Sequence, residues 1–320
     1  MTDRSPSDRS PSDRWDLTDI PGQTGRTILV TGTTVGGLGH HTALELARHG
    51  ARVVLTGRSP ERIAETEQAI LAEVADAVLE TVQLDLADLS SVRRAAATAA
   101  DLGPIDVLVN NAGVMGTAYH RTADGLELQM ATNHFGPFLL TGLLLPQLAA
   151  SGEGRVVSIS SQMHRIARSA PLDDPLVQHG RYQRWPTYGQ TKLANLLFAY
   201  ELDRRLRRAG SPVKALAAHP GFASTHLAAN GQYGRSSGGI ATILDGAIKL
   251  VSPNTAAQGA WPTLMAATSD LPGATYVGPD GLLEWGGRPR VTTSNKLSHD
   301  ESVQRELWEL SERVTGISYP

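Results

Sequence analysis

Short apolar runs rich in β-branched residues alternate with longer amphipathic segments along most of the chain. This alternation is typical of βαβ units, in which a crossover helix joins two parallel strands. Each of the first six runs is followed by a helical pattern, such as His40–His49 or Leu193–Leu206. The pattern predicts a doubly wound α/β Rossmann fold, with a mainly seven-stranded parallel sheet and helices on both faces. The predicted strands are Thr27–Thr31, Arg52–Thr56, Glu80–Leu84, Ile105–Val109, Arg155–Ile159, Val213–Ala217 and Ala274–Val277.

The first residues depart from this alternation. Residues 1–14 repeat a polar, proline-containing Ser-Pro-Ser-Asp-Arg unit, which cannot bury apolar surface and is predicted to be a disordered tail. Between residues 25 and 320 no linker rich in Gly, Pro or Ser marks a domain boundary. Because 320 residues with 41% hydrophobic content can build one large core, we expect a single Rossmann-fold domain over residues 15–320.

Composition and charge exclude several classes of function. The net charge of -3, from 29 basic and 32 acidic residues, provides no positive field that would attract nucleic acid or anionic membranes. The chain shows neither a signal-peptide core nor a run of the about 20 apolar residues that span a bilayer, so we expect a cytoplasmic protein. The absence of cysteine excludes disulfides and thiolate chemistry, and the 10 histidines show no metal-ligand spacing.

A glycine-rich loop joins the first predicted strand to the helix that follows it. Glycines in such a loop allow a tight turn and a close approach to a pyrophosphate, whose charge is met by free N–H groups and the positive end of the helix dipole. A glycine cluster alone also fits an ordinary turn, but the flanking strand and helix favour a nucleotide site. The predicted contacts are Gly32, Thr34, Gly36, Gly37, Leu38 and Gly39.

The end of the second predicted strand bears on which nucleotide is bound. An acidic side chain there would accept hydrogen bonds from the ribose of NAD and repel the additional phosphate of NADP. The strand ends in Thr56-Gly57-Arg58, and no acid occurs before Glu61. The Arg58 guanidinium can pair with a 2′-phosphate, so NADP is preferred and NAD stays possible. Alternatively, Arg58 is an ordinary solvated arginine.

A tyrosine and a lysine four residues apart suggest acid/base chemistry. Tyr188 and Lys192 would share one face of a helix. A phenol, with a pKa of about 10, carries protons poorly at neutral pH unless a nearby cation stabilises its anion, and Lys192 can supply that charge. In isolation the spacing also fits a tyrosine that merely begins a buried stripe with Leu193, Leu196, Leu197 and Tyr200.

Further motifs follow one another in a recognisable order: Asn110-Asn111-Ala112-Gly113, Asn133 within Thr132-Asn133-His134-Phe135-Gly136, Ser161 at the end of Ser158-Ile159-Ser160-Ser161, and Pro220-Gly221-Phe222-Ala223-Ser224-Thr225. With the glycine loop and the Tyr188–Lys192 pair, the chain resembles the short-chain dehydrogenase/reductase family from about Trp15 to its C-terminus. The resemblance is strongest to the branch that contains retinol dehydrogenases and protochlorophyllide reductase. The lack of cysteine speaks against the latter activity.

The resemblance implies a catalytic tetrad and further cofactor contacts. Tyr188 would donate or accept the proton, Ser161 would hold the substrate oxygen, Lys192 would lower the tyrosine pKa and bind the nicotinamide ribose, and Asn133 would position a water. A small lipophilic carbonyl or alcohol substrate and a homodimer or homotetramer are implied as well. The further implied cofactor contacts are Asp85, Leu86, Asn111, Ala112, Gly113, Pro220, Gly221, Ala223 and Thr225.

Two features depart from the family pattern. The usual spacing is Gly-x-x-x-Gly-x-Gly, but one residue is inserted here. Either Gly37 and Gly39 act as the second and third glycines, or Gly36 takes the middle place and Leu38 replaces the last. In addition, the long stretch between Ser161 and Tyr188, together with Phe222–Val251, is predicted to cover the substrate.

Several histidine and tryptophan side chains near these motifs are expected to have structural roles and not catalytic ones. His164, three residues after Ser161, could touch the substrate, but a surface-loop position is favoured. His134 and His219 are expected to be packed or hydrogen-bonded, and Trp261 and Trp285 are assigned to the core.

These motifs favour an NADPH-dependent carbonyl reductase or the reverse alcohol dehydrogenase. A protein that senses NADP without turnover is the alternative from another class, although it would need none of the tetrad for chemistry. An epimerase that oxidises its substrate transiently is a third possibility.

Overall fold

The computed structural model describes residues 14–170, 182–222 and 254–320. Its centre is an eight-stranded sheet with the order β3-β2-β1-β4-β5-β6-β7-β8, in which β8 alone is antiparallel to its neighbour. The doubly wound α/β fold predicted from the sequence is therefore confirmed, with eight strands instead of seven. The strands are β1 (Thr27–Val30), β2 (Arg52–Gly57), β3 (Val78–Gln83), β4 (Val107–Asn110), β5 (Arg155–Ile159), β6 (Lys214–Ala218), β7 (Tyr276–Pro279) and β8 (Pro289–Val291).

The strand that the sequence pattern missed lies at the edge of the sheet. Strand β8 has only three residues, and two of them, Arg290 and Val291, are exposed. No alternation of buried and exposed positions can develop over so short a segment. Its first residue is Pro289, which has no N–H to donate and is tolerated at the start of an edge strand.

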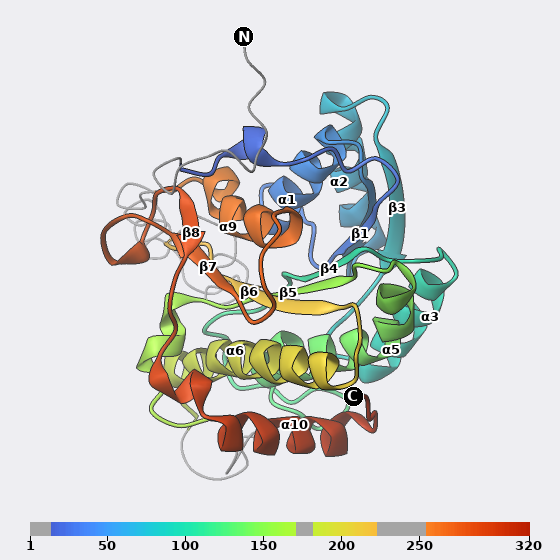
Figure 1. Ribbon diagram of the computed structural model, residues 1–320. Coiled ribbons are helices and arrows are strands. Elements are labelled where there is room, and N and C mark those ends of the chain that lie inside the picture. Colours follow the sequence, from blue (N-terminus) through green and yellow to red (C-terminus); the bar gives the residue numbers. More distant parts are fainter. Residues whose placement is uncertain (1–13, 171–181, 223–253) are drawn as a thin grey trace, which may run out of the picture.

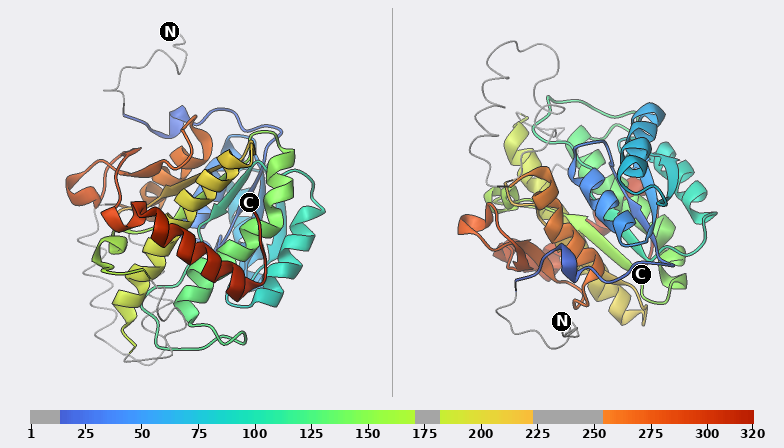
Figure 2. Two further views of the ribbon diagram at one scale, coloured as in Figure 1. Left: turned by 60° about the horizontal axis from the view of Figure 1, so that its bottom comes forward. Right: turned by 90° about the horizontal axis from the view of Figure 1, so that it is seen from above.

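Two layers of helices cover the two faces of the sheet (Figure 1). Helices α1, α2 and α9 lie on one face and α3, α5 and α6 on the other, while α10 packs outside α6, as Figure 2 also shows. The helices are α1 (Leu38–Arg48), α2 (Pro60–Glu73), α3 (Leu89–Ala100), the short α4 (Leu128–Met130), α5 (Gly136–Ala150), α6 (Arg184–Arg208), α9 (Ala256–Thr268) and α10 (Glu301–Thr315).

The central strands are buried on both faces, which explains their uninterrupted apolar sequences. In β1, Ile28 and Val30 join the core cluster beneath α1 and α9, whereas Leu29 joins the cluster beneath α3, α5 and α6. In β2, Val53 and Val54 divide in the same way. Successive side chains of a strand point to opposite faces, so a strand between two helical layers needs apolar residues at every position.

Polar residues beyond the strands begin the helices at the same edge of the sheet. The Ser59 hydroxyl accepts the Arg62 N–H at the start of α2, and Pro60 occupies the first turn. Asp88 caps α3 through the N–H groups of Ser90 and Ser91. Because β2 and β3 are parallel, the residues that follow them lie at one edge of the sheet.

That edge collects most of the predicted functional residues. The carboxyl ends of parallel strands meet there, and the strand order reverses between β1 and β4, which is where open α/β sheets bind their ligands. Within the described residues, no helix is long and apolar enough to cross a membrane. Residues 1–13 of the predicted tail, and residues 171–181 and 223–251 of the two predicted substrate-covering segments, lie outside the described part.

Candidate active site

The end of β1 is held against the end of β4 by a set of short hydrogen bonds. The Thr31 hydroxyl accepts the N–H groups of Asn111 and Ala112, both at 2.9 Å. The Asn111 side-chain amide donates to the carbonyls of Thr31 at 2.7 Å and Gly32 at 3.1 Å. Asn111 therefore fixes the first turn of the glycine loop through its side chain.

The geometry of the loop favours the first of the two glycine alignments. A Cβ atom at Gly39 would lie 2.3 Å from the Gly32 carbonyl oxygen and 2.6 Å from the Asn111 side-chain nitrogen, so α1 approaches β1 too closely for any side chain. Gly37 is the N-cap of α1 and offers no side-chain cap, which leaves the first N–H groups of the helix for a ligand. Gly36, at φ +77°, accommodates the inserted residue, and its N–H donates to His40 Nδ1 at 3.4 Å.

A pocket of about 800 Å³ opens beside this loop along the ends of β1 to β4. Its walls contain most of the predicted cofactor residues, namely Gly32, Thr34, Gly37, Leu38, Arg58, Asp85, Leu86, Asn111, Ala112 and Gly113. Gly36 and Gly39 lie in the same loop but do not line the pocket. Glycines leave the loop backbone free of side chains, so it can approach a ligand closely, and this loop and the open helix terminus fit a dinucleotide phosphate.

Sequence reasoning missed two polar residues of this pocket, Ser59 and Arg62. Ser59 is the N-cap of α2 and Arg62 lies in its first turn. The four-residue spacing from Arg58 to Arg62 is the signal that could have found the second arginine. Within the described residues, neither guanidinium makes a hydrogen bond or ion pair. Two unpaired cations therefore line the pocket at the end of β2.

Three of the four predicted catalytic residues come together beside this pocket. Ser161 follows β5, whereas Tyr188 and Lys192 lie one turn apart on α6. The Ser161 hydroxyl lies close enough to the Tyr188 phenol to lower its pKa. The Lys192 ammonium donates to the Ile159 carbonyl at 3.0 Å and lies 5.6 Å from the centre of the Tyr188 ring. A hydroxyl, a phenol and a cation are thus packed within one small buried region.

Burial shifts the pKa of both groups on α6. It raises the pKa of the Tyr188 phenol to about 12, against the opposing effect of the hydrogen bond with Ser161. It lowers the pKa of the Lys192 ammonium to about 8. The phenol is therefore protonated at neutral pH and can act as a proton donor.

Asn133 holds the cluster together through its side chain. It lies in a π-helical turn, Ala131–Phe135, a distortion found often at functional sites. Its Oδ1 accepts the Val114 N–H at 2.7 Å, and its Nδ2 donates to the Val114 carbonyl and the Thr191 hydroxyl, both at 2.9 Å. The Asn133 amide thus forms its hydrogen bonds with Val114 and Thr191. Its role in positioning a water stays a prediction.

The pocket and the buried cluster meet at Gly113. Gly113 lines the pocket. A Cβ atom there would lie 3.0 Å from Asn133 Oδ1 and 3.6 Å from the Lys192 ammonium. A ligand that extends along the pocket therefore reaches the Ser161, Tyr188 and Lys192 side chains at this point.

Comparisons with known proteins agree with this arrangement. A family model described as short chain dehydrogenase matches residues 26–171. Retinol dehydrogenase 13 of Homo sapiens is 38% identical over 92% of this chain and 86% of its own length. The chain belongs to the short-chain dehydrogenase/reductase family. It is an NAD(P)-dependent oxidoreductase of the retinol dehydrogenase-like branch.

Two further relatives cover nearly the whole of this dehydrogenase/reductase. Polyprenol dehydrogenase of Mus musculus is 37% identical over 93% of the chain and 86% of its own length. The crystal structure of an uncharacterized protein from Mycobacterium paratuberculosis is 40% identical, with a TM-score of 0.77 and coverage of 96% of this chain and 100% of that one. The likeness thus extends well beyond the segment matched by the family model.

The wall beside Tyr188 contains residues that the sequence reasoning did not single out. The Gln129 amide accepts the Gly116 N–H at 2.8 Å and donates to the Tyr182 hydroxyl at 2.6 Å and the Arg184 carbonyl at 3.0 Å. The Gln129 side chain therefore links the loop after β4 to the start of α6 through hydrogen bonds. The Trp185 ring lies against Gly116, because a Cβ there would be only 3.3 Å from it.

Two sequence-based expectations near the site are wrong. His164 is fully buried, not on a surface loop. It donates from Nδ1 to the Ser161 carbonyl at 2.6 Å and accepts the Asn295 N–H at Nε2, because a segment distant in sequence packs over it. Trp285 is 48% exposed, not in the core, because it follows a left-handed turn that directs it outward.

The structural roles predicted for the other two histidines agree with the structure. His134 and His219 are both buried, and they contact Ser311 and Glu284 respectively. Trp261 is partly buried against the core cluster under α1 and α9.

The remaining predicted cofactor contacts follow β6. Pro220 and Gly221 lie at the same edge of the sheet, while Ala223 and Thr225 lie outside the described residues. Within the described ranges, no group of three or more acidic or histidine side chains could hold a metal ion.

Proposed function

We propose that this protein is an NADP-dependent oxidoreductase that reduces a small lipophilic aldehyde or ketone to an alcohol, or catalyses the reverse reaction. The observation that carries the proposal is the buried contact between Ser161 and Tyr188, with Lys192 beside them and the nucleotide pocket adjoining at Gly113. Retinol dehydrogenase and polyprenol dehydrogenase are named for lipophilic alcohols, which supports a substrate of this class.

The roles of the three side chains follow from the charge that develops during reduction of a carbonyl. NADPH, when bound, supplies the hydride. The Ser161 hydroxyl donates a hydrogen bond to the substrate oxygen, and Tyr188 delivers a proton to the same oxygen as negative charge accumulates on it. Lys192 stabilises the phenolate that remains after proton transfer. In the oxidative direction, Tyr188 takes the proton back.

The preference for NADP rests on the two cations at the end of β2. Arg58 and Arg62 line the pocket without a described partner, and Ser59 lies between them. Guanidinium groups form charge-assisted hydrogen bonds with phosphate oxygens. A cofactor with a 2′-phosphate therefore binds here more tightly than one with a free ribose hydroxyl. Gly37 and the first N–H groups of α1 would hold the pyrophosphate.

The remaining predictions complete the proposal. We propose a single domain over residues 15–320, a cytoplasmic location and a homodimer or homotetramer. A protein that senses NADP without turnover is not favoured, because the full-length relatives are named as dehydrogenases. An epimerase stays distinguishable by experiment, because it would regenerate its cofactor in every cycle.

A substrate screen tests this proposal. Purified protein is expected to oxidise NADPH in the presence of lipophilic aldehydes or ketones, and to use NADH less efficiently. Absorbance of the reduced cofactor, followed with each cofactor over a panel of retinoid, isoprenoid and aromatic carbonyls, measures both preferences. Saturable binding of NADPH without oxidation by any member of the panel would contradict the proposal and revive the sensor.

The pH dependence of reduction is expected to follow Lys192. Burial lowers the pKa of the Lys192 ammonium to about 8, whereas the pKa of Tyr188 is raised to about 12. The cationic lysine is present below its pKa and is lost as pH rises through about 8, while the tyrosine still carries its proton. We therefore expect kcat/KM for reduction to be flat at neutral pH and to fall by roughly tenfold per pH unit above about pH 8.

Replacement of Lys192 by arginine is the matched control for the pH profile of kcat/KM. The Lys192→Arg variant keeps its charge at alkaline pH, so its activity, although lower, should lack the fall near pH 8. A wild-type profile that stays flat to about pH 10 would show that the charge of Lys192 is not required.

A further inference from the structure

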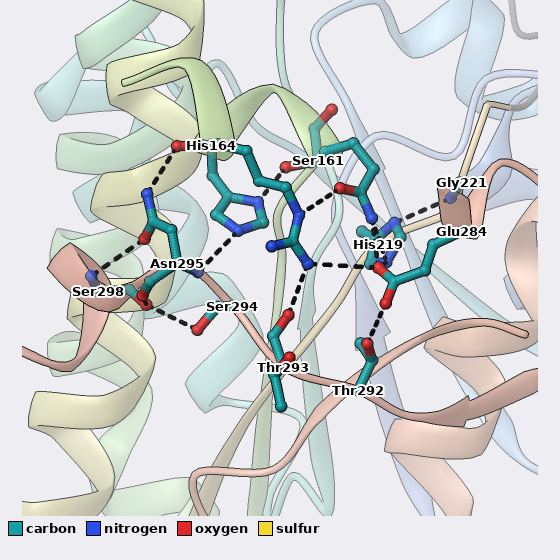
Figure 3. A network of polar contacts seen from close by, with 12 residues as sticks. Ser161, His164, His219, Gly221, Glu284, Thr292, Thr293, Ser294, Asn295 and Ser298 are labelled. Atoms are coloured by element: carbon teal, nitrogen blue, oxygen red, sulfur yellow. Dashed lines mark hydrogen bonds and ion pairs between the residues drawn. The ribbon is translucent and has the colours of Figure 1, made fainter. Parts of the chain in front are cut away.

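A second polar cluster lies next to Ser161 and includes His219 and Glu284 (Figure 3). Its centre is Glu284, in the short 3-10 helix Leu282–Glu284 between β7 and β8. The Glu284 carboxylate accepts hydrogen bonds from Gln162 after β5, from His219 after β6 at 3.1 Å, and from Thr292 after β8. One side chain thus joins three separate segments of the chain.

The proton positions in this Glu284 cluster follow from the backbone. The Gly221 N–H donates to His219 Nδ1 at 3.2 Å, so that nitrogen carries no proton and the proton lies on Nε2, which donates to Glu284. Burial lowers the pKa of His219 and keeps the ring neutral. Burial alone would raise the pKa of Glu284, but the hydrogen bonds from His219, Thr292 and Gln162 lower it to about 2. Glu284 is therefore a carboxylate held mainly by neutral donors.

The backbone of Glu284 adopts a conformation that is costly for its residue type. Leu283 and Glu284 both have positive φ angles, 54° and 56°, in the left-handed region that favours glycine. Such a conformation persists only where surrounding contacts maintain it. The Leu283 side chain is 65% exposed and supplies no packing to do so. The turn is held by backbone hydrogen bonds, such as that from the Gly281 N–H to the Gly286 carbonyl at 2.7 Å, and by the hydrogen bonds to the Glu284 carboxylate, which anchor it to neighbouring segments.

The strained turn packs directly on the segment that follows β6. The Phe222 N–H donates to the Trp285 carbonyl at 2.7 Å. A Cβ atom at Gly221 would lie 2.6 Å from the same carbonyl oxygen, and one at Gly278 would lie 2.0 Å from His219 Nε2. Glycine is required at both positions, because the turn and the His219 ring occupy the space of a side chain. The path of residues 219–222 is therefore set by the turn that Glu284 holds.

The cluster also reaches the residue next to the catalytic serine. Gln162 follows Ser161 directly and donates to Glu284. Arg165, in the same 3-10 helix Gln162–Ile166, donates to the Gln162 side chain at 2.7 Å and to the Thr293 carbonyl at 2.8 Å. The Arg165 guanidinium is 3.7 Å from the Glu284 carboxylate, and its side chain is 42% exposed. Solvent screening makes this ion pair weak, so the neutral hydrogen bonds dominate.

We propose that Glu284 is a positioning residue for hydride transfer. It fixes the Ser161–Gln162 end of β5 relative to the Pro220–Gly221 turn after β6. Because Ser161 is proposed to hold the substrate oxygen and the Pro220–Gly221 turn to border the nicotinamide, Glu284 sets the distance between the reacting groups. This inference rests on the proposed function, but Glu284 itself neither lines the nucleotide pocket nor contacts the Tyr188 phenol.

The decisive variant is Glu284→Ala, which removes all three hydrogen bonds. A misplacement of about 1 Å between reacting groups costs roughly a hundredfold in rate, so we expect kcat per cofactor-binding site to fall by between about tenfold and a hundredfold. Bound NADPH should also lose part of its nicotinamide fluorescence enhancement. The affinity for 2′,5′-ADP, which occupies only the pocket between β1 and β4, should be unchanged. A merely structural role would instead lower the number of binding sites and leave kcat per site unaltered.

Two matched variants complete the experiment. Glu284→Gln keeps an oxygen for His219 and Gln162 and can donate to the Thr292 hydroxyl, so it should restore most of the rate. Leu283→Asn changes the neighbouring exposed residue in the same left-handed turn, with a residue that tolerates this conformation, and should behave as wild type. The inference is overturned if Glu284→Ala matches Leu283→Asn in both kcat per site and NADPH fluorescence.

The inference can still be tested if the Glu284→Ala variant does not fold or if the wild-type protein shows no turnover. If Glu284→Ala does not fold, Thr292→Val removes one donor from the carboxylate and is expected to lower kcat per site about threefold, a loss on the scale of one ordinary hydrogen bond; an unchanged rate then overturns the inference. If the wild-type protein reduces no carbonyl, the proposed function fails. The fluorescence of bound NADPH in the Glu284→Ala variant still decides the positioning role.

Discussion

Replacing Tyr188 by phenylalanine is expected to lower kcat for carbonyl reduction about a thousandfold, since a positioned general acid contributes between 10² and 10⁴ in rate. The substitution removes only the phenolic oxygen of a buried side chain that lies beside Ser161. The ring itself and its edge-to-face contact with Trp185 are retained. Binding of NADPH should therefore persist while turnover is lost, which steady-state rates and cofactor titration measure separately.

The same helix supplies a matched control for this prediction. Tyr200 is also a buried tyrosine of α6, and its hydroxyl forms one hydrogen bond, at 2.9 Å to Ser294. Tyr200→Phe removes a comparable oxygen twelve positions along the helix and should leave kcat within about twofold, since a single hydrogen bond contributes little to stability and none to this chemistry. Turnover that survives in Tyr188→Phe would show that another group supplies the proton.

Replacing Arg58 and Arg62 together by alanine is expected to abolish the preference for NADPH. Each charge-assisted hydrogen bond contributes about 1.5–3 kcal/mol, so KM for NADPH should rise by roughly a hundredfold. KM for NADH, which lacks the 2′-phosphate, should change little, because both guanidinium groups lie at the end of the pocket beside β2. Steady-state kinetics with each cofactor gives the ratio directly.

An arginine away from the pocket serves as the control. Arg94 is an exposed residue of α3 with a long ion pair to Asp88 at 3.8 Å, and its replacement by alanine should leave both KM values unchanged. Equal losses for NADPH and NADH in the double variant would mean that Arg58 and Arg62 support the pocket in general and do not recognise the 2′-phosphate.

Local patterns were sufficient to predict the central sheet. The β5 strand has the predicted bounds, Arg155–Ile159, and β2 extends one residue beyond the prediction. Both strands are buried on two faces, so apolar and β-branched residues predominate in their centres. Strand β8 could not be predicted in this way. It is short and mostly exposed, and only its hydrogen bonds to β7 identify it as a strand.

The candidate site shows the same division between local and distant contacts. Tyr188 and Lys192 share one turn of α6, and a helical pattern places them together without further information. The burial of His164 depends on Asn295, which lies 131 residues away. The contact of His219 with Glu284 spans 65 residues and needs a left-handed turn at two residues that are not glycine. Nothing in the local sequence around either histidine indicates these partners.

The most direct test of the account follows the hydride itself. NADPH that carries deuterium at the transferable position of its nicotinamide ring is incubated with the wild-type protein and a lipophilic aldehyde, and the products are analysed by mass spectrometry. The account predicts an alcohol that carries one deuterium on its carbinol carbon, formed in a one-to-one ratio with oxidised cofactor. Cofactor that binds but is never consumed, or an altered substrate that gains no deuterium, would contradict it.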